Sequence, residues 1–335
     1  MTSVPKRRIG ALAGVVAVAA FVFVVSPPDS GAELRVVVPP GATLGEVVDS
    51  LDAQGIVRAS GLFELYARAR GAAPRLKAGH YEIPAPSSWA SVVRRLTRGE
   101  VLTEPMTIPE GFSLAQMAPR MAAVSGVPAD SVRALLRSPE LAERLEVPGP
   151  GLEGYLFPDT YFFASGVPVE RMVSAMVARY QALWTPERRA RLEEIGLTEQ
   201  EAVTLASIVQ AEARHEDEMT QIAGVYHNRL ERGWLLQADP TVLYALGGYR
   251  ARLLFAAIDS VADNPYNTYA FAGLPPGPIG SPGEAAIDAA LNPTGDYLYF
   301  VAWPDGSHIF TRSLADHNEA VDSARRARRA DGADD

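Results

Sequence analysis

Glu212 is the carboxylate whose surroundings in the sequence best suit acid–base chemistry. Three apolar residues of the same predicted helix, Leu205, Ile208 and Val209, precede it by seven, four and three positions. This spacing places all four side chains on one face, so the Glu212 carboxyl group projects from an apolar stripe. Desolvation there raises the pKa of a carboxyl group, which then stays protonated near neutral pH and can donate its proton. The alternative interpretation is a structural salt bridge to one of three arginines: Arg214, Arg229 or Arg232.

Polar residues that follow Glu212 are the first candidates for holding a substrate. Asn228 lies on the next predicted helix. Gln237, Asp239 and Thr241 come after it, in a polar stretch beside an apolar run. Asp239 precedes a proline, so it could instead start a turn or cap a helix that begins at Thr241.

Aromatic and amide side chains form a second group of candidates. Tyr266, Asn267 and Thr268 lie close in sequence to the proline-rich loop 274–278. Aromatic faces and amides are typical of a sugar-binding cleft, and equally of a well-capped loop. The sequence leaves both interpretations open.

Composition and motifs argue against several other kinds of chemistry. The chain has 335 residues and no cysteine, so thiolate sites are excluded. Its formal net charge of −9 argues against a protein that coats nucleic acid. The only lysines are Lys6 and Lys77, and neither a phosphate loop nor a serine-hydrolase elbow occurs. His215 and Glu216 begin a zinc-type motif whose fifth position is Met219, so its second histidine is missing. We therefore expect no metal and no cofactor.

The helix that carries Glu212 must be positioned by neighbours whose boundaries are well marked. A capping box of Thr198 and Glu201 starts this helix, which is expected to end near Ala213. The preceding helix has Thr185 as its N-cap and Pro186 in its first turn. Further elements are expected at 172–184 and 220–232 as helices, and at 297–302 and 308–310 as a strand pair. Residues 103–323 are thus predicted to form a mixed helix and sheet domain of the α+β class, followed at 324–335 by a flexible tail or solvated helix end.

A smaller module precedes this domain. Residues 36–44 read as a strand, a Pro-Gly turn and a helix start, with Thr43 and Glu46 spaced as a capping box. The phrase recurs at 106–114, where Ser113 and Gln116 form the second box. Residues 33–102 are expected to form a compact α+β module whose size suits binding or spacing.

The amino terminus carries a membrane signal. Three basic residues, Lys6, Arg7 and Arg8, precede an uncharged apolar run over Ile9–Val25. The positive-inside rule then predicts a cytoplasmic segment at 1–8, a single transmembrane helix at 9–26 and an extracytoplasmic remainder. A cleaved signal peptide is the alternative. Outside the cytoplasm the cell wall is the abundant polymer, and ATP-driven chemistry is not expected.

Taken in order, these sequence motifs resemble those of the endolytic murein transglycosylase family (MltG, YceG-like), whose members are membrane-anchored enzymes that cut peptidoglycan. The resemblance covers nearly the whole chain, including the amino-terminal anchor and a LysM-like module at 33–102. Its motif phrases lie at 151–161, 205–212, 224–230, 236–244, 265–269 and 273–278. The family phrase Ser-Ile-Val-Glu-x-Glu has its catalytic second Glu at Glu212, whereas Gln210 replaces the first Glu and can only offer hydrogen bonds.

The resemblance implies a lytic reaction on peptidoglycan glycan strands. Glu212 would protonate the leaving glycosidic oxygen and then accept the proton of the muramyl 6-hydroxyl, giving a 1,6-anhydro end. A hydrolytic muramidase is the alternative, and it would need a second carboxylate such as Asp239 or Glu153. An inactive wall-binding scaffold for synthases is the third reading. Substrate-binding roles are expected for the following residues: Asn228, Gln237, Asp239, Thr241, Tyr266, Asn267, Thr268 and Glu153. Expected partners are glycan strands, the bilayer through Ile9–Val25, and wall synthases.

Overall fold

The computed structural model describes residues 22, 25, 32–248 and 255–330, and it divides into two compact units. The first unit runs to Pro105 and includes Phe162–Val167. The second unit comprises Met106–Tyr161 and the chain from Pro168 onward. The combination of helices with small two-stranded sheets confirms the predicted α+β class.

Over the described residues 32–102, the first unit has two antiparallel strands and three α-helices around one core. Strand β1 pairs with β2, with Val36 opposite Tyr81. Val36 and Val38 are buried while Val37 is half exposed, as expected for a strand with one face on a core. The predicted capping box of Thr43 is present at the start of α2. The elements are β1 Ala32–Val38, α2 Leu44–Ala53, α3 Ser60–Ala69, η1 Ala73–Arg75, β2 Gly79–Ala85 and α4 Trp89–Arg98.

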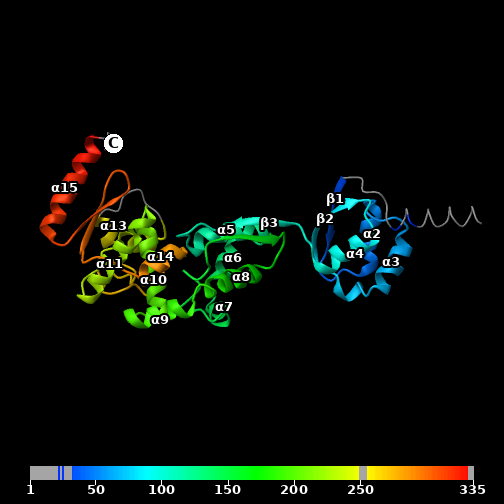
Figure 1. Ribbon diagram of the computed structural model, residues 1–335, viewed down its shortest axis with the longest axis horizontal. Helices are drawn as coiled ribbons and strands as arrows, with labels where there is room; N and C mark the ends of the chain where they lie inside the picture. Colours follow the sequence, from blue (N-terminus) through cyan, green and yellow to red (C-terminus); the bar gives the residue numbers. More distant parts are fainter. Residues whose placement is uncertain (1–21, 23–24, 26–31, 249–254, 331–335) are drawn as a thin grey trace, which may run out of the picture. The chain divides into compact units, whose positions relative to one another are not determined.

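The second unit contains Glu212, and it has most of the helices drawn in Figure 1. Two short strands, β3 and β4, pair with each other and have residues in both units, and strands β5 and β6 form an antiparallel hairpin near the end of the second unit. The first elements are β3 Thr103–Thr107, α5 Leu114–Ser125, α6 Ala129–Leu136, α7 Pro139–Arg144, β4 Thr160–Ala164, α8 Val169–Gln181 and α9 Pro186–Ile195. The later elements are α10 Glu199–Glu212, η2 Glu216–Glu218, α11 Met219–Glu231, α12 Asp239–Ala245, α13 Phe255–Asp259, α14 Glu284–Leu291, β5 Tyr299–Ala302, β6 His308–Thr311 and α15 Leu314–Ala330.

Helix α10 lies in the centre of the second unit's core and packs against α11 and α14. Every residue from Ala202 to Val209 is buried, so the helix is enclosed on all sides. The predicted capping box of Thr198 and Glu201 starts it, and it ends at Glu212. A buried helix of this kind holds its last residue in a fixed place.

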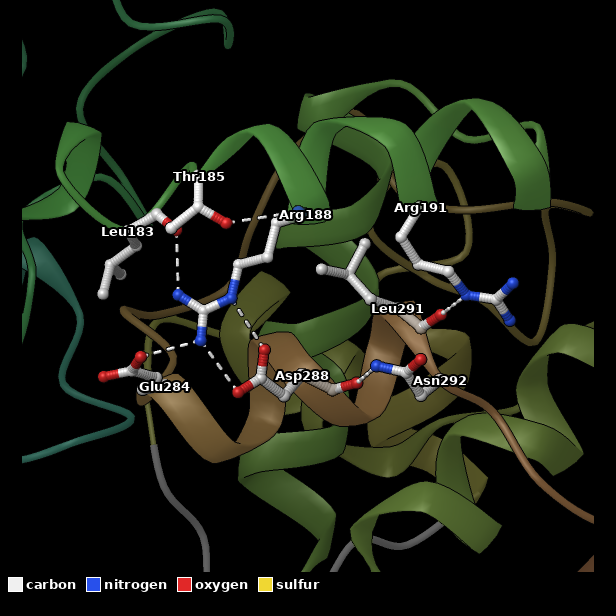
Figure 2. A network of polar contacts seen from close by, with 8 residues as sticks. All are labelled: Leu183, Thr185, Arg188, Arg191, Glu284, Asp288, Leu291 and Asn292. Atoms are coloured by element: carbon white, nitrogen blue, oxygen red, sulfur yellow. Dashed lines mark hydrogen bonds and ion pairs between the residues drawn. The ribbon is translucent and has the colours of Figure 1, made fainter.

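Helix α14 is tied to α9 by a charged network (Figure 2). The Arg188 guanidinium group donates to both carboxylate oxygens of Asp288 at 2.8 Å and to Glu284 at 2.7 Å. It also donates to the Leu183 carbonyl oxygen at 2.8 Å, and the Arg188 side chain is only 16% exposed. Arg191 adds a bond to the last carbonyl of α14, that of Leu291. Because α14 packs on α10, this network indirectly supports the helix that carries Glu212.

The sequence signals for other boundaries are also confirmed. Thr185 caps α9, and Pro186 is its first residue. The hairpin occurs where it was predicted, although its first strand starts at Tyr299. The residues predicted as a flexible or helical tail from Ala324 continue α15 as far as Ala330.

The predicted membrane anchor at 9–26 lies outside the described residues, apart from Val22 and Val25. Within the described part of the chain, none of the helices combines the length and apolar character needed to span a bilayer.

Candidate active site

Glu212 is the last residue of α10, at the edge of the core. The Tyr226 hydroxyl group, from α11, donates a hydrogen bond of 2.8 Å to Oε1 of Glu212. Glu212 itself keeps intermediate solvent exposure, so a substrate can reach the carboxyl group. Among the described residues no arginine lies within salt-bridge distance of Glu212, although the charge of Arg229 acts on the carboxyl group.

The surroundings of Glu212 favour its protonated form. Burial raises the pKa of this carboxyl group to about 7, and the negative charge of Asp239 acts in the same direction. The Tyr226 hydrogen bond and the positive charge of Arg229 oppose them by stabilising the carboxylate. A pKa near 7 lets the group both donate and accept a proton at neutral pH.

Arg229 supplies a fixed positive charge beside the carboxyl group. It is buried, and it donates to the carbonyl oxygens of Leu298 at 2.8 Å and Leu236 at 2.7 Å. Its guanidinium carbon also lies 5.3 Å from the centre of the Tyr299 ring. These contacts hold Arg229 in place without using a carboxylate.

Asp239 is the second acidic group of this region. It is exposed at the first position of α12, and its Oδ1 accepts a 2.6 Å hydrogen bond from the Tyr269 hydroxyl group. The helix cap is Ala238, and it makes no side-chain bond, so the expectation that Asp239 caps a helix beginning at Thr241 is wrong. Asp239 is thus free to act on Glu212 or on a ligand.

Three predicted binding residues lie inside the protein. Thr241, Asn267 and Thr268 are buried, and the two threonine hydroxyl groups lie 2.9 Å apart. The Thr268 hydroxyl also accepts from the backbone N–H of Ala238, while the Asn267 amide donates to two backbone carbonyls. These groups order the loop that precedes Asp239, because their hydrogen-bonding capacity is used within the protein.

Asn228 and Gln237 lie on either side of this region. The Asn228 amide donates to the carbonyl oxygens of Gly295 and Tyr297, at 3.2 and 2.9 Å, and so ties α11 to the segment before β5. Gln237 is exposed and has φ of +52°, a left-handed conformation that is costly for a residue other than glycine. Such strain in an exposed loop is common at binding sites.

Glu153 is a further acidic residue, and its contacts differ from those of Glu212 and Asp239. Its two carboxylate oxygens accept from the backbone N–H of Leu114, at 3.0 Å, and from the Tyr244 hydroxyl group, at 3.1 Å. Burial raises the pKa of Glu153 to about 7. The Tyr244 ring packs on the Tyr266 ring at 4.9 Å, so Glu153 and Tyr266 share a cluster at the far end of α12 from Asp239.

The sequence analysis did not single out Tyr226 or Tyr269, although each donates to an acidic residue of the site. Burial raises the pKa of both phenols, so they remain hydrogen-bond donors at neutral pH. The side chain of Gln210 makes a structural hydrogen bond, since its Oε1 accepts from the backbone N–H of Gly283 at 2.9 Å. It links α10 to the segment that leads into α14.

Comparisons with known proteins identify the family of the chain. The YceG-like family model matches residues 36–323. An endolytic murein transglycosylase of Bacillus subtilis (strain 168) is 30% identical over 309 residues, which cover 87% of this chain and 85% of that protein. The enzyme of the same name from Streptococcus pneumoniae serotype 2 is 32% identical over 85% of this chain, and the match covers 57% of its own length.

A solved structure shares the fold. The crystal structure of a yceG-like protein from Listeria monocytogenes matches with a TM-score of 0.60 and 30% identity, over 87% of this chain and 99% of that chain. The residues matched by the family model include Glu212. The chain belongs to the YceG-like family.

Proposed function

We propose that the chain is an endolytic peptidoglycan lytic transglycosylase and that Glu212 is its only acid and base. The observation that carries this proposal is the place of the Glu212 carboxyl group, which is reachable from solvent and is held on one oxygen by Tyr226, where burial raises its pKa to about 7. The names of the relatives supply the substrate class, since they are endolytic murein transglycosylases.

The proposed reaction uses the two protonation states of one group in turn. The protonated Glu212 donates its proton to the glycosidic oxygen as the bond to the muramyl C1 breaks. The resulting carboxylate then accepts the proton of the muramyl 6-hydroxyl, whose oxygen closes onto C1 to give a 1,6-anhydro end. Arg229 and the Tyr226 hydroxyl stabilise the carboxylate between the two steps. No water is consumed.

The predicted binding residues divide into two roles. Exposed Gln237 and Asp239 contact the sugars beside the cleaved bond, whereas Glu153 and Tyr266 contact a more distant part of the strand. The buried residues Thr241, Asn267 and Thr268 hold the loop that precedes Asp239, and the partly buried Asn228 ties α11 to the segment before β5.

The remaining parts of the chain suit an enzyme that works at the cell wall. The apolar run Ile9–Val25 anchors the chain in the plasma membrane with its amino terminus in the cytoplasm. The first unit is a LysM-like module that binds glycan strands. It has an open depression of about 420 Å³ beside the β1–α2 turn, lined by Val37, Pro39, Pro40, Gly41, Ala42, Glu46, Val47 and Ser50. Wall synthases are the proposed partners, because the internal cuts would fall in newly made strands.

The proposal is tested with Glu212→Gln and Asp239→Asn on uncrosslinked glycan strands. We expect Glu212→Gln to abolish cleavage and to retain strand binding, because the amide keeps the Tyr226 hydrogen bond and cannot deliver a proton. Asp239→Asn should keep measurable cleavage. Cleavage by Glu212→Gln at the wild-type rate would refute the assignment, and loss of cleavage in both variants would favour the hydrolytic muramidase.

A further inference from the structure

The β5–β6 hairpin lies against the short linker that follows Glu212. The His215 ring nitrogen Nε2 lies 3.4 Å from the carbonyl oxygen of Asp305, at the tip of the hairpin. A Cβ atom on Gly306 would lie 2.9 Å from Cδ of Arg214, and Gly306 has φ of +92°. A glycine is therefore required for the hairpin to approach this closely.

A buried acid–histidine pair fastens the hairpin next to its turn, where His308 begins β6. Oε2 of Glu218 lies 2.7 Å from Nδ1 of His308, and Oε1 accepts from the backbone N–H of His308 at 2.9 Å. The two side chains are 15% and 4% exposed. The reaction proposed above does not use this pair, which is unusual for two titratable groups so well buried.

An aromatic ring connects this pair to the candidate acid. Phe300 of β5 packs edge-on against the His308 ring at 5.3 Å and against the Tyr226 ring at 5.8 Å. Tyr226 in turn donates to Oε1 of Glu212. Contacts therefore run without a gap from Glu218 to Glu212, and each one restricts the next side chain.

We propose that Glu218 and His308 are positioning residues for the acid: they dock the hairpin so that Phe300 holds the Tyr226 hydroxyl group on Oε1 of Glu212. No described residue donates to Oε2 of Glu212, so the held orientation leaves this oxygen to exchange the proton. The catalytic consequence rests on the proposed function, while the positioning does not.

The proposal has a measurable signature in the titration of Glu212. The groups that act on this carboxyl are Tyr226 and Arg229 from α11, Asp239 from α12 and Tyr269 from the following loop. The Tyr226 interaction depends on the hairpin through Phe300, and Arg229 contacts Tyr299 at the start of its first strand. Both interactions favour the carboxylate, so loosening the hairpin moves the Glu212 midpoint to higher pH.

The experiment is a carbon-13 NMR titration of the full-length chain labelled in its glutamate carboxyl groups, with Glu212 assigned by loss of its signal in Glu212→Gln. We expect Tyr226→Phe to raise the midpoint by about one pH unit, since a hydrogen bond to a charged group is worth about tenfold or more in an equilibrium. Glu218→Ala should raise it by a smaller amount and lower kcat with KM retained. Glu218→Gln should return it toward the wild-type value, because its amide oxygen still accepts from the His308 backbone.

A matched control lies at the other end of the same helix. Tyr180 is buried and donates to Glu199 at 2.6 Å, so Tyr180→Phe removes the same kind of bond from the start of α10. It should leave the Glu212 midpoint unchanged. Phe300→Leu interrupts the contacts while leaving the Glu218–His308 pair intact, and it should raise the midpoint in a folded protein.

The outcomes separate the two proposals. A lower melting temperature of Glu218→Ala and Phe300→Leu, with the Glu212 midpoint at its wild-type value, would overturn the positioning role and leave a merely structural one. If the variants show the predicted Glu212 midpoints but the wild-type chain cleaves no glycan, the positioning role is supported and the proposed function is refuted.

Discussion

Replacing Glu212 by glutamine should stabilise the fold, and the gain should grow with pH. Burial raises the pKa of this carboxyl group from an ordinary value of 4.5 to about 7. Below pH 4.5 the group is protonated in both the folded and the unfolded chain, so its titration does not change the free energy of unfolding. As the pH rises toward 7, the unfolded chain loses this proton more readily, so the folded state loses stability. The glutamine side chain does not titrate, so the variant does not lose this stability as the pH rises.

The magnitude follows from the difference of 7 − 4.5, or 2.5 pH units. At about 1.36 kcal/mol per unit the upper bound is about 3.4 kcal/mol above pH 7. Because Glu212 keeps some solvent exposure, screening reduces this value. We expect Glu212→Gln to raise the free energy of unfolding by about 1 to 3 kcal/mol at pH 8, and by about zero at pH 4.

The assay is urea denaturation at pH 4, 6 and 8, followed by tryptophan fluorescence. Three of the four tryptophans lie in the second unit: Trp184, Trp234 and Trp303. The control is Glu143→Gln, which changes an exposed glutamate on α7 and should alter stability by less than about 0.5 kcal/mol at each pH. The reasoning about burial would be refuted if Glu212→Gln raised the free energy of unfolding equally at pH 4 and pH 8, or at neither pH.

Three other predictions use different parts of the structure. Glycan cleavage should fall as the pH rises past about 7, because the donor is protonated Glu212; initial rates that increase up to pH 9 would contradict this. Arg188→Ala should cost about 2 to 4 kcal/mol in thermal unfolding, since it leaves two carboxylates unpaired, whereas Arg312→Ala at an exposed pair should leave the melting temperature nearly unchanged. Gly224→Ala places a Cβ atom 2.0 Å from a backbone oxygen and should destabilise by about 2 to 3 kcal/mol; Gly61→Ala, in open space, should be neutral or slightly stabilising, and equal effects of the two changes would speak against this close contact.

Local signals in the sequence were sufficient for the start of the helix that carries Glu212. The box of Thr198 and Glu201 depends on contacts within one helical turn, which a sequence displays directly. The apolar stripe before Glu212 is only part of the buried surface, because every residue from Ala202 to Val209 is buried.

The partners of the acid could not be predicted in the same way. Tyr226 lies 14 positions after Glu212, and the two side chains meet only because α10 and α11 pack together. The burial of Thr241 and Thr268 depends likewise on a contact between segments 27 residues apart. Residue type alone therefore suggested sugar binding for groups whose hydrogen bonds hold a loop in place.

Mass spectrometry of the new strand ends, made by the full-length chain and by Glu212→Gln from uncrosslinked glycan, tests the central claim most directly. We predict that the wild-type chain alone produces ends lighter by one water than a reducing end, which is the mark of a 1,6-anhydro sugar. Reducing ends from the wild-type chain, or anhydro ends from Glu212→Gln, would contradict a lytic reaction that depends on Glu212 alone.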